Sequence, residues 1–220
     1  MQGTDTSIAS NTIKMSQYFQ IHPDNPQPRL INQAVAILRR GGVIAYPTDS
    51  CYALGCHLGD KAAMERIRRI RKLDDRHDFT LVCRDLSEIA LYARIDNAAF
   101  RLIKSHTPGP YTFILKATAE VPRRLLTRRK TIGLRVPDSP IAQSLSASLD
   151  DPVMSVTLIP PGEDLPMTDP NEISAQIGND VDLIIDGGSC GIQPTTVVDL
   201  TDTLPRLLRR GLGNTHAFEE

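Results

Sequence analysis

The feature that most constrains this chain is the stretch 41–55 (GGVIAYPTDSCYALG), in which a short apolar run leads into a polar loop. Residues 43–46 are β-branched, small or aromatic and follow two glycines, which predicts a buried strand. Pro47 has no N–H to donate to a neighbouring strand, so the strand should end there. Residues 48–50 (TDS) then follow the strand end, where open α/β sheets hold their ligands. The same residue types are common in plain turns, so a turn and a binding loop both stay open.

The rest of the chain alternates between helical and strand-like patterns, which predicts an α/β domain with a mixed sheet. Segment 160–170 is acidic and rich in proline, and we expect an irregular surface loop there rather than a lid. The patterns predict helices at 28–40, 60–72, 86–92, 97–105 and 141–149. They predict strands at 43–46, 79–83, 111–115, 131–136, 153–157, 181–185, 196–200 and 206–208.

Four segments resemble motifs of the YrdC/YciO family, and they occur in the order of that family. Segment 47–55 resembles its substrate loop, 107–115 (TPGPYTFIL) a strand entry, and 132–137 (IGLRVP) an arginine-containing strand end. The pair 194–200 (PTTVVDL) and 208–211 (LRRG) resembles its closing motifs. Together they extend from about residue 33 to residue 211, and the YciO branch is the most similar. The resemblance implies a single-domain α/β fold, a twisted open mixed sheet with helices on its faces.

Length and composition fit that expectation. The 220 residues are enough for one domain with a substantial core, and 40% are hydrophobic. Residues 1–14 are polar and small, so we expect 1–17 to be a tail or an extension and 18–220 to be the domain. The net charge of −1 by itself points to neither a nucleic acid nor a membrane.

Cysteines and apolar runs limit the possible location and cofactors. The four cysteines form no CxxC pair and no disulfide spacing, so reduced, unliganded thiols are expected and no metal site is predicted. No apolar run approaches the ~20 residues of a membrane span. The first residues lack the charged and apolar regions of a signal peptide. We therefore expect a cytoplasmic protein without a membrane partner.

The chain contains neither a P-loop nor a GxGxxG motif, so a nucleotide site has to be assembled from scattered arginines, lysines and threonines. The family resemblance implies such a site. YrdC-type members join L-threonine, bicarbonate and ATP into threonylcarbamoyl-AMP, the first step towards threonylcarbamoyl-adenosine in tRNA. The expected ligand is therefore a nucleotide or adenylate, with ATP and Mg²⁺ as a possible substrate and no tightly bound cofactor. Such a reaction requires no covalent nucleophile, and no catalytic residue is assigned.

The resemblance assigns roles to positions that match the family motifs. Without it, the arginines could be strand-edge surface charges, and the threonines could be present for their strand propensity. The residues expected around the nucleotide are Arg71, Lys72, Thr112, Arg135, Thr157 and Arg209. Those expected around the threonine are Thr48, Tyr52 and Thr195.

Two motifs depart from the pattern of the synthases. Where the synthases have K-x-R, this chain has 71–73 (RKL), so the second cation is missing and arginine replaces the first. Where they have S-x-N, this chain has 157–159 (TLI), so the amide is missing. Each well-placed donor is worth about 2–4 kcal/mol in a transition state. The expectation is a diverged threonylcarbamoyl-AMP synthase homologue with weak or altered activity.

A second hypothesis is a non-catalytic module that binds double-stranded RNA or tRNA, an association that the family carries. Aromatic residues are only 5% of the chain and it has no RNP-like motif, so such binding would follow shape and phosphate. Alternatively, helix 60–72 turns its arginines to solvent, where they pair with Glu65, Asp74 and Asp75. A third option, an adenylate hydrolase, has no distinctive marker. The candidate RNA-binding residues are Arg66, Arg68, Arg69, Arg123, Arg124, Arg128 and Arg129.

Overall fold

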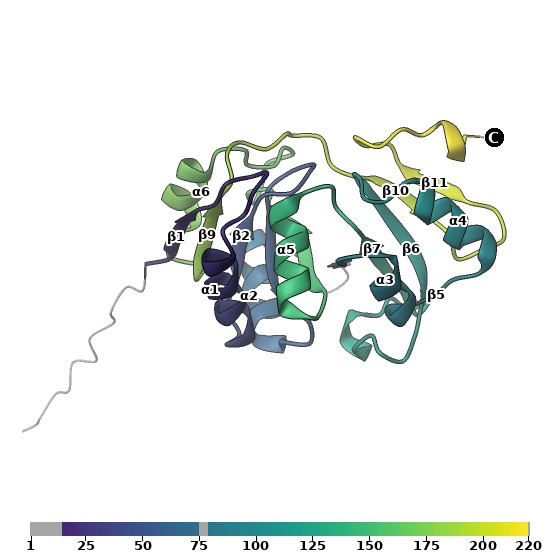
Figure 1. Cartoon of the computed structure of the whole chain (residues 1–220), viewed down its shortest axis with the longest axis horizontal. Coiled ribbons are helices and arrows are strands. Elements are labelled where there is room, and N and C mark those ends of the chain that lie inside the picture. The colour runs from purple at the N-terminus through teal and green to yellow at the C-terminus, as the bar shows by residue number, and fades with distance from the viewer. Residues whose placement is uncertain (1–14, 75–78, 220) are drawn as a thin grey trace, which may run out of the picture.

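The computed structural model describes residues 15–74 and 79–219, whose strands form one mixed sheet (Figure 1). The strand order is β1-β9-β2-β3-β8-β4-β7-β6-β10-β11, and β5 pairs with β6. The first strands are β1 (Gln17–Gln20), β2 (Ile44–Tyr46), β3 (Ala53–His57), β4 (Thr80–Val82), β5 (Ala93–Arg94) and β6 (Tyr111–Ala117). The others are β7 (Thr131–Arg135), β8 (Val153–Thr157), β9 (Leu183–Asp186), β10 (Thr196–Asp199) and β11 (Arg206–Arg209). Parallel and antiparallel pairs both occur, so the expected single α/β domain with a mixed sheet is confirmed.

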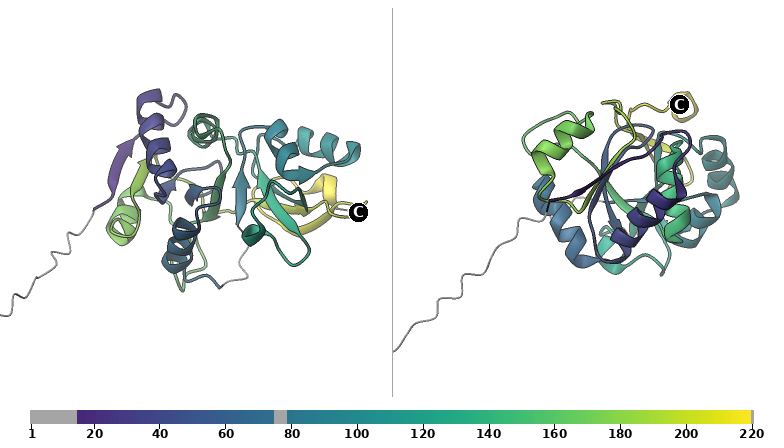
Figure 2. Two further views of the ribbon diagram at one scale, coloured as in Figure 1. Left: turned by 90° about the horizontal axis from the view of Figure 1, so that it is seen from below. Right: turned by 60° about the vertical axis from the view of Figure 1, so that its left-hand side comes forward.

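Helices cover both faces of this sheet, as the two further views in Figure 2 show. They are α1 (Pro28–Arg39), α2 (Lys61–Arg71), α3 (Leu86–Tyr92), α4 (Asn97–Ser105), α5 (Pro140–Leu149) and α6 (Pro170–Ile177). Two 3₁₀ turns, η1 (Arg123–Leu125) and η2 (His216–Phe218), complete the elements. No described helix combines the length and the apolarity that a membrane crossing needs.

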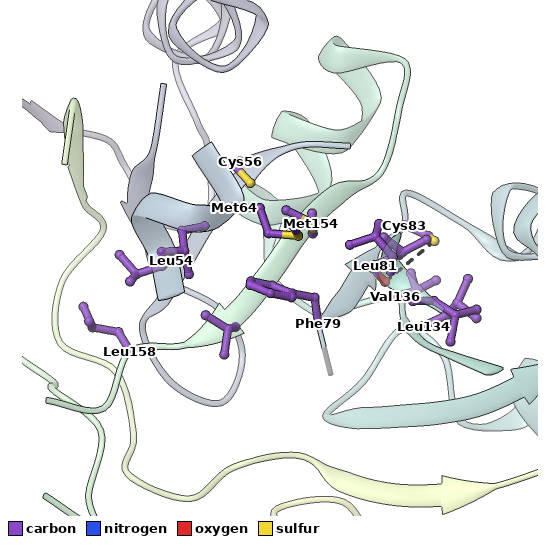
Figure 3. Packing of buried hydrophobic residues seen from close by; sticks show 14 of the residues in the cluster. Leu54, Cys56, Met64, Phe79, Leu81, Cys83, Leu134, Val136, Met154 and Leu158 are labelled. Carbon is purple, nitrogen blue, oxygen red and sulfur yellow. Dashed lines mark hydrogen bonds between the residues drawn. The ribbon is translucent and has the colours of Figure 1, made fainter. Parts of the chain in front are cut away.

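The two faces of the sheet carry separate parts of the core. Side chains alternate across a strand, so Ile44 and Tyr46 of β2 face α1 and α5, whereas Ala45 joins the opposite cluster. Figure 3 shows the opposite cluster, with Phe79 lying between residues of β3 and β8 on one side and of β4 and β7 on the other. Burial on both faces explains why the strands are nearly continuous apolar runs.

The expected elements are present, with ends that differ by at most two residues. The helix α6 was not predicted, because its eight residues follow directly on the proline-rich segment and bury only Pro170 and Ile173. The strand β1 was not predicted either, because its residues are mostly exposed and do not alternate. It begins at Gln17, one residue before the expected start of the domain. The rest of the expected tail, 1–14, lies outside the described residues.

The stretch 41–55 forms a hairpin that brings its polar loop to the middle of the sheet. Strand β2 ends at Tyr46, and β3 returns antiparallel to it, with Tyr46 opposite Ala53. The loop of residues 47–52 is held from the other side by the segment after β9. A Cβ on Gly187 would lie 2.9 Å from Cγ of Pro47, so only glycine permits this close approach.

Candidate functional site

The loop after β2 opens onto a cavity of about 240 Å³, here called the central cavity, which lies on β4, β6, β7, β8 and β10. Gly133 of β7 keeps it open, because a Cβ there would lie 3.3 Å from side-chain atoms of Thr112 and Thr80. Seven of the nine residues expected around nucleotide and threonine line this cavity. They are Thr48, Arg71, Thr112, Arg135, Thr157, Thr195 and Arg209.

Thr48 organises the loop. Its hydroxyl donates to the carbonyl oxygen of Cys51 (2.7 Å) and accepts from the backbone N–H groups of Ser50 and Cys51 (both 3.2 Å). The Ser50 hydroxyl lies 3.1 Å from it. The loop is thus a turn that also forms part of a cavity wall. The Cys51 thiol also lines the cavity, but burial raises its pKa, which disfavours a thiolate nucleophile.

Arg135 joins this loop to β7 through a buried ion pair with Asp49, whose side chain is 8% exposed. The guanidinium also donates to the Ser50 hydroxyl (3.4 Å), while the second oxygen of Asp49 accepts from the backbone N–H of Asp138 (2.9 Å). Nε of Arg135 is buried and has no hydrogen-bond partner within residues 15–74 and 79–219. Because an unpaired buried donor is costly, a ligand oxygen at this atom would be stabilising.

A second network continues the same wall. The hydroxyls of Thr112 and Thr195 lie 2.9 Å apart, and Arg209 donates from Nη2 to the Thr195 hydroxyl (3.1 Å) and from Nε to the Thr195 carbonyl (3.1 Å). Whichever threonine donates to the other, one hydroxyl hydrogen stays available to a ligand. Burial, and secondarily the nearby Arg135, lower the pKa of Arg209. We call Thr48, Ser50, Thr112, Arg135, Thr195 and Arg209 the hydroxyl wall.

The remaining described wall is apolar apart from Arg71 and three hydroxyl residues, Thr80, Ser155 and Thr157. Arg71, at the end of α2, donates to the carbonyl oxygen of Ile159, and its buried Nε has no hydrogen-bond partner among the described residues. Burial lowers the pKa of this guanidinium. The side chains of Phe79, Val156 and Ile159 complete this wall, which we call the aliphatic wall.

Two predicted site residues and one departure from the family pattern lie away from the cavity. Tyr52 is fully buried, and its hydroxyl donates to the carbonyl oxygen of Gly188 (2.8 Å), so it fastens the 187–195 segment to the hairpin. Lys72 is the left-handed, exposed residue that ends α2. Leu73, where synthases have their second cation, is partly buried and packs against the core. Helix termination uses this position for an apolar contact.

Four polar residues of the described site, Asp49, Ser50, Thr80 and Ser155, were not among the predicted site residues. Asp49 and Ser50 belong to the loop that the sequence singled out, so their proximity to Thr48 was a usable signal. Ser155 of β8 also lines the cavity, and it accepts from the Tyr46 hydroxyl (2.8 Å) and donates to the carbonyl of Leu54 (3.3 Å). It lies among apolar residues, and only strand pairing reveals that it faces the cavity.

A second hollow of about 470 Å³ adjoins the central cavity and shares four of its lining residues, Phe79, Ile114, Gly133 and Val197. It extends over β6, β7, β10 and β11. Its lining adds apolar side chains to three arginines and one carboxylate. These further residues are Leu125, Thr127, Arg128, Arg129, Thr131, Ile132, Asp199, Thr201, Arg206 and Leu208.

The seven arginines considered for RNA fall into two groups. On α2, Arg66 pairs with Asp182 (2.7 Å) and Arg68 with Glu65 (3.2 Å), while Arg69 lines a hollow beside Asn179. The pairing of Arg68 with Glu65 is the intrahelical contact that the alternative interpretation expected. Of the other two expected partners, Asp74 is described and Asp75 lies outside the described residues. The remaining four arginines lie on η1 and the loop before β7.

The second group borders a cationic hollow of about 780 Å³, lined by Arg94, Arg123, Arg128 and Lys130. Among the residues that the structure describes, none of these four side chains pairs with a carboxylate. Thr127 and Arg128 line both this hollow and the second hollow, so the two are neighbours. Arg124 points elsewhere, since a Cβ on Gly59 would lie 3.4 Å from its Nη2.

Comparisons with known proteins agree with this geometry. A family model, Sua5_yciO_yrdC, described as "Telomere recombination", matches residues 36–211. The protein "Uncharacterized protein YciO" of Escherichia coli (strain K12) is 61% identical over 205 residues, 93% of this chain and 100% of that protein. A threonylcarbamoyl-AMP synthase of Coxiella burnetii is 33% identical over 158 residues, 71% of this chain and 84% of the synthase.

Solved structures confirm the fold. The crystal structure of E. coli YciO has a TM-score of 0.90 at 61% identity and covers 93% of this chain and 100% of that one. The crystal structure of P. abyssi Sua5 complexed with L-threonine has a TM-score of 0.79 at 25% identity. It matches 89% of this chain, which corresponds to 58% of Sua5. Sua5 is therefore the longer protein.

Proposed function

The chain belongs to the Sua5/YciO/YrdC family, and from that premise we propose that the central cavity and the second hollow together bind an adenylate of the threonylcarbamoyl-AMP type. The observation that carries this proposal is the hydroxyl wall. Two independent networks, centred on Arg135 and Arg209, aim hydroxyl and guanidinium groups at one cavity. Cations and hydroxyls suit a ligand that carries a carboxylate and a phosphate.

Size supports the use of both hollows. The central cavity, at about 240 Å³, is smaller than the ~300 Å³ at which pockets for drug-sized ligands begin. An adenylate therefore needs the adjoining space, whose apolar residues Ile114, Ile132 and Val197 suit a planar ring. We place the acyl and phosphate groups in the central cavity and the base in the second hollow.

Synthesis from ATP, L-threonine and bicarbonate is proposed to be weak. Leu73 packs against the core instead of supplying a cation, and Ile159 offers an aliphatic side chain where synthases have an amide. Binding depends on the hydroxyl wall, and synthesis depends also on groups that stabilise the leaving pyrophosphate. The chain retains the hydroxyl wall but lacks part of the groups that would stabilise the leaving pyrophosphate.

The test of adenylate binding is thermal unfolding with and without AMP. A ligand at 100 times its Kd stabilises the folded state by about 2.7 kcal/mol, which is roughly 5–10 °C for a chain of this size. Arg209→Ala should abolish the shift without unfolding the protein. The matched control is Arg210→Ala, since Arg210 is exposed and pairs with Glu219; it should keep the shift. Equal loss in both variants, or no shift at millimolar AMP, would contradict the proposal.

A second candidate function is the binding of structured RNA, and the cationic hollow favours it. Its four cations have no carboxylate partner among the described residues, so phosphates could pair with them directly. Such binding would release counterions and weaken steeply as salt rises. Replacing Arg123 and Arg128 with Glu should abolish the gel shift of a short RNA duplex. Replacing Arg66 and Arg69, which lie on α2, should not.

A further inference from the structure

Resting on the proposed function, we propose that this cavity selects nucleoside monophosphates and their acyl anhydrides against di- and triphosphates. The aliphatic wall decides the selection. A nucleotide whose first phosphate meets Arg71 would place any further phosphate near Val156 and Ile159. The described lining adds the hydroxyls of Thr80 and Thr157 there but no second cation. A desolvated charge without a counter-charge is costly.

The cations of the central cavity match a ligand with few charges. Among the described residues its lining contains three, Arg71, Arg135 and Arg209, and Arg135 is already paired with Asp49. The other two, Arg71 and Arg209, have no carboxylate partner in the described part of the chain. A phosphate monoester carries about −1.5 to −2 charges at neutral pH, which these two can balance. The chain of a triphosphate brings roughly two charges more, for which the described lining has no further cation.

Arg71 itself can serve only one phosphate. One of its terminal nitrogens is committed to the carbonyl oxygen of Ile159, and no described residue pairs with the buried Nε. An oxygen at Nε would satisfy that donor, as in the usual fork-shaped pairing of arginine with phosphate. The end of α2 adds nothing for a second phosphate. Lys72 is exposed, and Leu73 packs against the core.

The orientation of α2 also disfavours a second or third phosphate. Arg71 is the last residue of this helix, so the cavity faces the end at which helix carbonyls concentrate partial negative charge. A single phosphate held by Arg71 tolerates this field, but every further phosphate increases the repulsion. A helix N-terminus would have the opposite effect and is what polyphosphate sites commonly use.

The experiment is titration calorimetry of the full chain with AMP, ADP and ATP at fixed ionic strength, first with EDTA and then with Mg²⁺. Affinity should fall in that order, and AMP should bind at least tenfold more tightly than ATP in both buffers. Ile159→Asn, which supplies an amide donor, should raise the affinity for ATP, so that AMP binds less than threefold more tightly than ATP. Ile159→Val keeps the wall aliphatic and should leave the ratio of AMP affinity to ATP affinity unchanged.

The outcomes separate this inference from the proposed function. If AMP and ATP bind equally, or ATP binds more tightly, selection is refuted while adenylate binding stands. If none of the three nucleotides binds, the proposed function fails and the selection with it. The ratio of AMP affinity to ATP affinity in the parent protein tests the selection even if Ile159→Asn does not fold. Binding of AMP with the tenfold preference supports both.

Discussion

The two walls of the central cavity differ in how their polar groups are held. In the hydroxyl wall, Thr48, Arg135 and Thr195 each make several side-chain hydrogen bonds, so their positions are fixed before any ligand arrives. In the aliphatic wall, Arg71 has one bond, to a backbone carbonyl, and apolar side chains around it. Both walls contain residues that match the family motifs, but only one keeps a connected polar network.

This difference indicates that binding and synthesis can be lost separately. A preorganised set of donors recognises a ligand at little entropic cost. Synthesis additionally requires donors where charge develops on the leaving group. The comparison therefore predicts large losses of stability and of AMP affinity for substitutions in the hydroxyl wall. It predicts gains of synthase activity for polar substitutions in the aliphatic wall.

The largest expected effect comes from breaking the buried ion pair. Arg135→Gln should lower the free energy of unfolding by about 3–5 kcal/mol, because it leaves the Asp49 carboxylate buried and without its cation. Arg71→Gln, on the aliphatic wall, should cost less than about 1.5 kcal/mol, the worth of a typical hydrogen bond. Urea unfolding measures both. The double variant Asp49→Asn/Arg135→Gln should be more stable than Arg135→Gln alone, and the comparison is wrong if it is not.

The second prediction is a gain of synthase activity. Leu73→Arg combined with Ile159→Asn should increase the formation of threonylcarbamoyl-AMP at least tenfold, since each donor is worth about 2–4 kcal/mol in the transition state. Mass spectrometry of the products from ATP, L-threonine and bicarbonate measures it. The rate is taken per folded protein, because Leu73 contributes to the core. A parent that already matches the Coxiella burnetii synthase would falsify the interpretation of the aliphatic wall.

A smaller effect is expected at the centre of the loop. Thr48→Val should cost about 2 kcal/mol of stability, because two backbone N–H groups of the loop and the Ser50 hydroxyl lose their partner. Thr48→Ser keeps the hydroxyl and serves as the control. Thermal unfolding measures the stability, and titration with AMP measures whether the loop contributes to the affinity. Unchanged AMP affinity in Thr48→Val would show that this loop does not take part in binding.

The smallest effect tests a residue that the sequence placed at the threonine. Tyr52→Phe should cost about 1 kcal/mol of stability through the lost bond to the Gly188 carbonyl, and it should leave the affinity for AMP and for L-threonine unchanged. Calorimetry with both ligands measures this. A tenfold loss of threonine affinity with normal stability would show that Tyr52 does take part in threonine binding.

Sequence predicted which residues line the cavity better than it predicted the packing around it. Thr112 was expected at the nucleotide and Thr195 at the threonine, far apart in the chain, and β6 and β10 bring their hydroxyls within 2.9 Å. The ordered motifs made this possible. Ser155 was missed because nothing local tells which strand faces the cavity. Tyr52 and Lys72 were assigned because they adjoin motif residues, yet neighbours in a strand or at a helix end point in different directions.

The sequence by itself determined the α/β class, most of the helices and strands, and the polar loop after the first buried strand. These are local properties, set by periodicity, by proline and glycine, and by residue type. The missing cation and amide followed from the family resemblance. Only the tertiary structure decided that Asp49 and Arg135 form a buried pair, that Leu73 serves the core, and that the basic residues divide into two groups. Each depends on which strands and helices become neighbours, and that is fixed by burial of the whole sheet on both faces.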